Sequence, residues 1–120
     1  MKILVADDSR VMRHIVKRTL RQAGYADVQV CEAGNGLEAL EVIATEAPDL
    51  VLCDWNMPKM NGLDLLTTLR ARGRDVPFGF VTSEGSSEMR EKAQNAGALF
   101  LIAKPFTPDA FREALEPVLG

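Results

Sequence analysis

Five short apolar runs alternate along the chain with five stretches in which apolar residues recur at helical spacing. The runs are Ile3–Ala6, Val28–Cys31, Leu50–Cys53, Phe78–Val81 and Leu99–Ile102. Continuous apolarity, as opposed to alternation, is typical of parallel strands buried on both faces. Strands that alternate with helices build a parallel sheet covered on both sides. The pattern therefore predicts an α/β fold, a doubly wound (βα)5 sheet, as a single domain over residues 1–120.

The helical stretches carry their own start and stop signals. Asn35 followed by Glu38, and Thr107 followed by Pro108, read as caps, whereas Gly24 and Gly97 read as stops. Pro117 predicts a frayed or bent final turn. The third helix is expected from Gly62 to about Arg72. The predicted inner faces are Met12, Ile15, Val16, Thr19, Leu20 and Ala23; Leu37, Leu40, Ile43 and Ala44; Leu65, Leu66 and Leu69; Met89, Ala93 and Ala96; and Phe111, Ala114, Leu115 and Val118.

Candidate site residues follow four of the five apolar runs. Asp7 and Asp8 come after the first, Asp54 after the third, Thr82 after the fourth and Lys104 after the fifth. In an open α/β sheet the loops at the carboxyl ends of the strands converge on one crevice. Three carboxylates that meet there repel one another, and a hard cation such as Mg²⁺, which prefers oxygen ligands, removes that cost. The sequence therefore predicts one site that combines an acidic cluster with a hydroxyl and an ammonium group.

The chain resembles the receiver domains of two-component response regulators. The resemblance is carried by these residues and by two motifs, Asp54-Trp55-Asn56-Met57-Pro58 and Lys104-Pro105-Phe106-Thr107. The resemblance runs from Lys2 to the final helix and is strongest to the single-domain chemotaxis type. It implies a flavodoxin-like sheet of strand order 2-1-3-4-5. It also implies a phospho-accepting switch in a phosphorelay, with Mg²⁺ as cofactor. The implied partners are a histidine kinase or histidine phosphotransfer domain upstream and a protein such as a flagellar switch component downstream.

The resemblance also assigns roles to individual residues. Asp54 is the phosphoacceptor, and Lys104, aimed into the site by a cis bond to Pro105, and Thr82 act with it. The implied metal ligands are Asp8, Asp54 and the Asn56 backbone carbonyl, with Asp7 acting mostly through water. Phosphorylation gives Asp54 up to about two negative charges, which Lys104 and the cation neutralise. The chain would catalyse its own phosphorylation and autodephosphorylation without being a turnover enzyme.

Two further positions bear on the lifetime and the readout of the signal. The resemblance implies that Asn56 and Glu84 tune the access of water to the phosphoryl group. It also implies that an aromatic residue three positions before the lysine follows the Thr82 hydroxyl inward, but Leu101 stands there, flanked by Phe100. Successive strand residues point to opposite faces, so Phe100 cannot substitute for Leu101. The expectation is a shift of the loop over residues 82–88 and of the fourth helix, with the aromatic switch replaced by a smaller rearrangement of Leu101 or lost. A one-position shift of the alignment over Leu99–Leu101 is the alternative.

Composition narrows the possible partners. Apolar residues make up 47% of the chain, aromatic residues 6%, and the formal net charge is −3. The acidic balance argues against direct nucleic-acid binding, and no apolar run approaches the roughly 20 residues that cross a membrane. Cys31 and Cys53 form no CxxC motif, which favours reduced thiols in the cytoplasm. Met1–Ala6 is too short for a signal peptide, and the ending at Gly120 favours a chain without an output domain.

One helix face is strongly basic. Arg10, Arg13, His14, Lys17 and Arg21 recur at helical spacing after the first apolar run. This face is either simply solvated or a docking surface for an acidic phosphodonor domain. Trp55 is expected to pack beside the site and to report on it by fluorescence.

Two other protein classes fit the residues less well, and two other roles within the receiver class stay open. A haloacid-dehalogenase-type phosphatase needs a second acid two residues after the phosphorylated Asp, where this chain has Asn56. A flavodoxin-like binding module needs a loop that attracts phosphate, which Asp7 and Asp8 would repel. Among receivers, a phosphorelay intermediate and a receiver separated from a DNA-binding regulator stay open. Leu101 favours these two, whereas Trp55–Pro58 favours a motility regulator.

Overall fold

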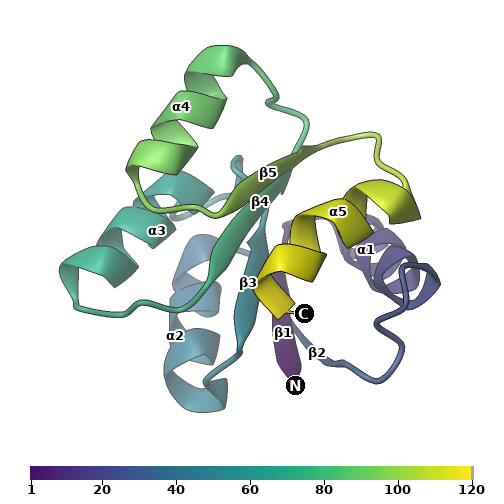
Figure 1. The fold of residues 1–120 in the computed structure, drawn as a ribbon. Coiled ribbons are helices and arrows are strands. Elements are labelled where there is room, and N and C mark those ends of the chain that lie inside the picture. Colours follow the sequence, from purple (N-terminus) through teal and green to yellow (C-terminus); the bar gives the residue numbers. More distant parts are fainter. Residues whose placement is uncertain (120) are drawn as a thin grey trace.

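The computed structural model describes residues 1–119, in which five strands and five helices alternate. The strands are β1 (Lys2–Ala6), β2 (Gln29–Ala33), β3 (Leu50–Cys53), β4 (Phe78–Thr82) and β5 (Phe100–Ala103). The helices are α1 (Arg10–Gln22), α2 (Gly36–Glu46), α3 (Gly62–Ala71), α4 (Ser87–Asn95) and α5 (Pro108–Leu119). All strand pairs are parallel, in the order β2-β1-β3-β4-β5, which confirms the predicted topology (Figure 1).

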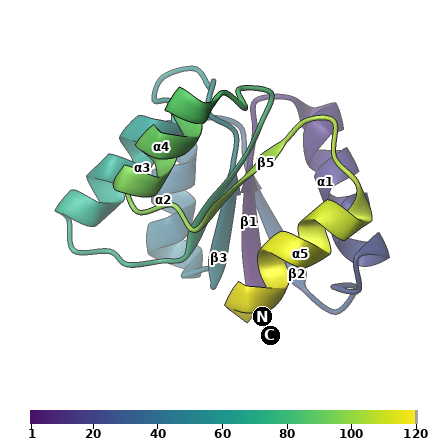
Figure 2. The ribbon, with the colours of Figure 1, turned by 45° about the horizontal axis from the view of Figure 1, so that its top comes forward.

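The helices form two layers around the sheet. Helices α1 and α5 cover one face, and α2, α3 and α4 cover the other (Figure 2). Alternate residues of β1 separate between the two cores, with Leu4 packed toward α2 and α3 and Ile3 packed toward α1 and α5. Every residue of β3 and β4 is buried. The central strands are therefore held rigidly on both sides, and their carboxyl ends are well-defined positions for a site.

The two edge strands, β2 and β5, are less buried than the prediction of strands buried on both faces. Strand β2 exposes Gln29 and Glu32, and β5 is mostly half-buried, because each has a neighbouring strand on one side only. Strand β2 also begins one residue later than the apolar run and continues to Ala33. Leu99 lies before β5 and is 55% exposed. Within residues 1–119, no helix has the length and apolarity needed to cross a membrane, and Gly120, the expected chain ending, lies outside the described residues.

The predicted helix caps are confirmed, but the prediction of the buried face of α2 was partly wrong. Asn35 Oδ1 accepts from the Glu38 amide at 2.8 Å, and Thr107 Oγ1 accepts from the Ala110 amide at 3.1 Å. In α2, Leu37 is 49% exposed and Ala44 is also exposed, whereas Ala39 is fully buried. The buried residues of α2 are Gly36, Ala39 and Ile43, so the buried face is rotated away from Leu37 and Ala44. Helix α5 includes Pro117 and continues to Leu119.

Gly62, the first residue of α3, is required by packing against the strand end that carries Asp54. A Cβ atom at Gly62 would overlap the carbonyl oxygen of Asp54 and the ring of Phe80. We expect Gly62→Ala to lower the free energy of unfolding by about 2–4 kcal/mol, because backbone has to move. Urea denaturation measures the change. Gly34→Ala, whose Cβ would lie 3.7 Å from the nearest atom, is the matched control, and equal losses in both variants would contradict this account.

Candidate functional site

Three carboxylates meet at the carboxyl ends of the two central strands β1 and β3. Asp7 and Asp8 directly follow β1, and Asp54 directly follows β3. One carboxylate oxygen from each of the three residues lies within 4.8 Å of the others. Asp7 is 4% exposed and Asp54 is 9% exposed, whereas Asp8 is open to solvent. The acidic cluster predicted from the sequence is therefore formed, with two members buried and one at its entrance.

Lys104 supplies the positive charge of the cluster. Its Nζ lies 2.9 Å from Asp7 Oδ2 and 3.4 Å from Asp54 Oδ2, and its side chain is 15% exposed. The Lys104–Pro105 peptide bond is cis, as the family resemblance implied. One ammonium therefore bridges two carboxylates that would otherwise repel each other in a poorly solvated place.

Backbone amides orient the two buried carboxylates. Asp54 Oδ1 accepts from the Trp55 amide at 2.7 Å, and Asp7 Oδ1 accepts from the Ser9 amide at 2.9 Å. The Asp54 amide itself donates to the Ala6 carbonyl at 2.9 Å, which ties the end of β3 to the end of β1. In each case Oδ1 is held by the backbone and Oδ2 faces Lys104. The Asp54 side chain is thus fixed in one orientation before any ligand arrives.

The pKa of Asp54 is raised above its ordinary value. Burial is the largest cause and the Asp7 carboxylate adds to it, while Lys104, the Thr82 hydroxyl and the Trp55 amide act in the opposite direction. The net effect means that the protein disfavours the charged form of this carboxylate. A second positive charge beside Asp54 would relieve that cost.

Thr82, Asn56 and Glu84 lie together on the side of the site toward β4. Thr82 is fully buried at the end of β4, and its Oγ1 accepts from the Glu84 amide at 3.2 Å. The Glu84 carboxylate Oε1 in turn accepts from Asn56 Nδ2 at 3.2 Å. Both side chains are exposed. The two positions expected to tune water access therefore contact each other across the loops that follow β3 and β4.

The donor set fits a magnesium ion. Mg²⁺ binds oxygen ligands, uses one or two carboxylates and keeps several waters. The cluster offers three carboxylates, and the exposure of Asp8 leaves space for water. None of the three residues is His or Cys, which argues against a softer metal. Lys104 lies nearer to Asp7, at 2.9 Å, than to Asp54, at 3.4 Å, which leaves Asp54 and the exposed Asp8 more open to an ion.

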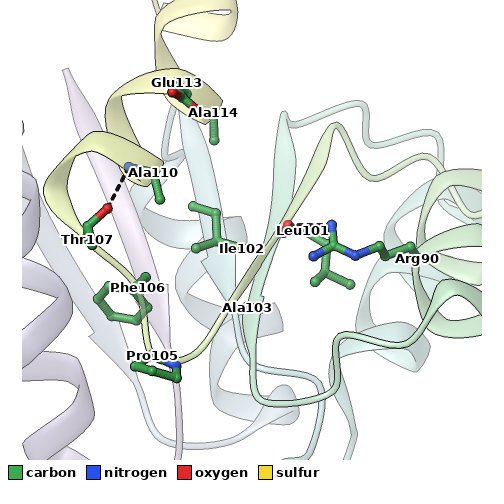
Figure 3. Close-up of a pocket in the computed structure, with 10 residues that line it drawn as sticks. All are labelled: Arg90, Leu101, Ile102, Ala103, Pro105, Phe106, Thr107, Ala110, Glu113 and Ala114. Atoms are coloured by element: carbon green, nitrogen blue, oxygen red, sulfur yellow. Dashed lines mark hydrogen bonds between the residues drawn. The ribbon is translucent and has the colours of Figure 1, made fainter.

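Leu101 of β5 stands where the family resemblance leads us to expect an aromatic switch residue. Leu101 packs toward the core beneath α4, and Phe100 packs toward the core beneath α5, so the two side chains lie on opposite faces of β5. Phe100 covers Gly79 of β4, where a Cβ would overlap its ring. Leu101 borders a depression of about 440 Å³ between α4 and α5 (Figure 3). Phe100 is therefore fixed elsewhere and cannot act in place of Leu101.

Arg90, which contacts the backbone of Leu101, was not singled out from the sequence. It projects from α4, and its Nη1 donates to the Leu101 carbonyl at 3.1 Å (Figure 3). Its Nε donates to the Gly85 carbonyl at 3.3 Å. An arginine on an exposed helix face gives no signal of this kind, because its contacts depend on how α4 sits against β5.

The basic face of α1 is only partly free. Arg13 and Lys17 lie 2.9 Å and 3.0 Å from the Glu32 carboxylate on β2. Burial acts to raise the pKa of Glu32, but the hydrogen bonds from these two cations outweigh it and the pKa is lowered. The basic side chains that remain exposed are Arg10, His14, Arg18 and Arg21. Three residues of the basic face predicted from the sequence, Arg10, His14 and Arg21, are therefore exposed, and Arg18 of the same helix is exposed as well.

A doubly wound parallel sheet with an acidic cluster and a lysine at its carboxyl edge defines the class of receiver-like α/β domains. The response regulator receiver domain family matches residues 3–116. Chemotaxis protein CheY1 of Helicobacter pylori is 48% identical over all of this chain and 98% of its own, and the CheY homolog of Campylobacter jejuni is 45% identical over all of this chain and 93% of its own. The structure of CheY4 from Vibrio cholerae has a TM-score of 0.84 at 33% identity, covering 98% of each chain. This chain belongs to the response regulator receiver domain family.

Proposed function

We propose that the chain is a phospho-accepting signalling switch in which Asp54 takes a phosphoryl group from a phosphohistidine. The observation that carries the proposal is the buried Asp54 carboxylate, with Oδ1 held by a backbone amide and Oδ2 facing Lys104. The donor is a histidine kinase or a histidine phosphotransfer domain. An Asp54 oxygen forms a bond to phosphorus as the histidine N–P bond breaks, which gives an acyl phosphate. Such transfer depends on positioning and electrostatics.

Lys104 and the amides around Asp54 perform most of this positioning. The Lys104 ammonium lies close enough to Asp54 to pair first with the carboxylate and then with the phosphoryl oxygens, which carry the negative charge after transfer. Thr82, buried beside Asp54, offers its hydroxyl to the same oxygens. In the proposed holoprotein Asp8, Asp54 and the Asn56 backbone carbonyl hold Mg²⁺, with Asp7 acting through water. Bound Mg²⁺ supplies the second positive charge, which neutralises the phosphoryl group.

Phosphorylation is proposed to change the affinity for an output partner in the cytoplasm. Chemotaxis proteins among the relatives support a motility role, with a flagellar switch component as the partner. The readout is a Thr82-linked movement of the loop over residues 82–88 and of α4. Leu101, which lacks the aromatic ring of the chemotaxis type, favours a second candidate, a phosphorelay intermediate or a receiver of a DNA-binding regulator.

The exposed basic side chains of α1 are the proposed docking surface for the phosphodonor. Arg10, His14, Arg18 and Arg21 are free of the Glu32 pairing, and α1 begins three residues after Asp7. Helix α1 contains no acidic residue, in a protein whose net charge is −3. An acidic partner surface would be steered to this helix and so to the site.

The Asn56–Glu84 contact is expected to set the lifetime of the acyl phosphate. We predict that Asn56→Met slows autodephosphorylation by about three- to tenfold, because an apolar chain in place of the amide no longer orients attacking water. Decay of the radiolabelled phosphoprotein after removal of the donor measures the rate. Asn95→Met, at the exposed end of α4, is the control. An unchanged decay in Asn56→Met removes the tuning role.

Trp55 provides the test of the proposed function. Trp55 directly follows Asp54 and is 6% exposed, and the centroid of its ring lies 4.7 Å from that of the Phe80 ring. We expect its fluorescence to change on addition of Mg²⁺ and again with beryllofluoride, and the second change to be absent in Asp54→Asn. No response in the wild type contradicts the proposal. Turnover of phosphomonoesters would instead indicate the phosphatase alternative.

A further inference from the structure

Arg90 connects two segments that lie on either side of the switch position. Its Nη1 donates to the Leu101 carbonyl of β5 at 3.1 Å, and its Nε donates to the Gly85 carbonyl in the loop after β4 at 3.3 Å. The guanidinium is planar and rigid, so the two bonds restrain both carbonyls together. A single side chain of α4 thus ties the edge strand to the loop.

The restrained loop is the one that carries the residues beside Asp54. Gly85 follows Glu84, whose amide donates to Thr82 Oγ1 and whose carboxylate accepts from Asn56. Holding the Gly85 carbonyl therefore restrains the adjoining Glu84 and, through its amide, the Thr82 hydroxyl. Through this loop, Arg90 is connected to the site without touching the reacting atoms.

Breaking the two Arg90 hydrogen bonds costs little free energy. The side chain is exposed and borders two depressions, of about 440 Å³ and 410 Å³, one on each side of it. Its hydrogen bonds compete with water, so each contributes only modestly to the stability of this conformation. Release of the guanidinium into solvent leaves no buried charge behind. The loop and β5 can therefore separate at small cost when another interaction favours it.

We propose that Arg90 is a positioning residue that holds the 82–88 loop against β5 in the unphosphorylated protein and opposes the movement that accompanies phosphoryl binding. The inference rests on the proposed function of Asp54. A contact made in only one of two conformations shifts the population toward that conformation and weakens ligands of the other. In a chain with Leu101 at the aromatic position, Arg90 supplies a side-chain link between the loop and β5.

Beryllofluoride, titrated in the presence of Mg²⁺ with Trp55 fluorescence as the signal, tests the inference. We expect Arg90→Met to bind it about three- to tenfold more tightly than the wild type, because two exposed hydrogen bonds no longer favour the unbound state. Arg90→Lys should fall between the two, because an ammonium lacks the fork that restrains both carbonyls. Lys92→Met removes a cation of α4 whose one ion pair within residues 1–119 is with Glu88 at 3.4 Å, and this variant should match the wild type.

A second measurement separates this role from a general effect on stability. In Arg90→Met without ligand, the amide NMR signals of Gly85 and Leu101 should move toward their positions in the beryllofluoride complex. Unchanged or weaker binding by Arg90→Met overturns the inference, as does equally tighter binding by Lys92→Met. Either result beside a normal wild-type response leaves the proposed function intact, whereas a wild type that does not respond contradicts the proposed function itself.

Discussion

Lys104→Met should weaken beryllofluoride binding by on the order of 100-fold, which corresponds to about 2.7 kcal/mol. The Lys104 ammonium lies 2.9 Å from Asp7 and 3.4 Å from Asp54, and its side chain is 15% exposed. Without it, two buried carboxylates and the incoming negative ligand share a site whose charge is no longer balanced. Titration followed by Trp55 fluorescence, at saturating Mg²⁺, measures the loss.

The control for Lys104→Met is Lys59→Met, which makes the same change of net charge at an exposed position in the loop after β3. Lys59→Met should bind beryllofluoride within about twofold of the wild type, because an exposed charge is screened by solvent and salt. Equal weakening in the two variants would show that bulk charge governs binding, and not the contact of Lys104 with Asp54.

Asp54→Asn should abolish phosphorylation and at the same time stabilise the metal-free fold at neutral pH by about 1–2 kcal/mol. The pKa of Asp54 is raised, chiefly by burial and also by Asp7, so its charged form disfavours the folded state. The sign follows from linkage: an acid with a raised folded-state pKa loses stability as the pH rises through that pKa. The gain in the variant should therefore be largest at neutral pH and should shrink on acidification.

Urea denaturation in the presence of a chelator, at a series of pH values, measures this difference. Asp27→Asn, in the exposed turn between α1 and β2, is the control and should leave the free energy of unfolding nearly unchanged. A loss of stability in Asp54→Asn at neutral pH, or a gain that grows on acidification, would contradict the raised pKa of Asp54.

The positions of the strands along the chain and the main residues of the acidic cluster could be predicted because both depend on features close together in the sequence. An apolar run followed by Asp54, or by Asp7 and Asp8, places a carboxylate at a strand end, and parallel topology brings strand ends to one edge. The Lys104 contacts follow from the same argument. The strand order came from the family resemblance and not from the apolar pattern alone.

What could not be predicted depends on contacts between elements. Leu37 and Leu99 are apolar yet exposed, because the small Ala39 faces the sheet in α2 and β5 begins one residue after Leu99. The pairing of Arg13 with Glu32 needs the register of α1 against β2, which no spacing within α1 shows. The two bonds of Arg90 likewise require the position of α4 beside β5.

The most direct test of the central proposal is the intact mass of the protein after incubation with acetyl phosphate and Mg²⁺. The wild type should gain one phosphoryl group, which hydroxylamine removes because it is an acyl phosphate, and Asp54→Asn should gain none. A wild type that gains no phosphoryl group, or an Asp54→Asn variant that gains one to the same extent, would contradict the assignment of Asp54 as the phosphoacceptor.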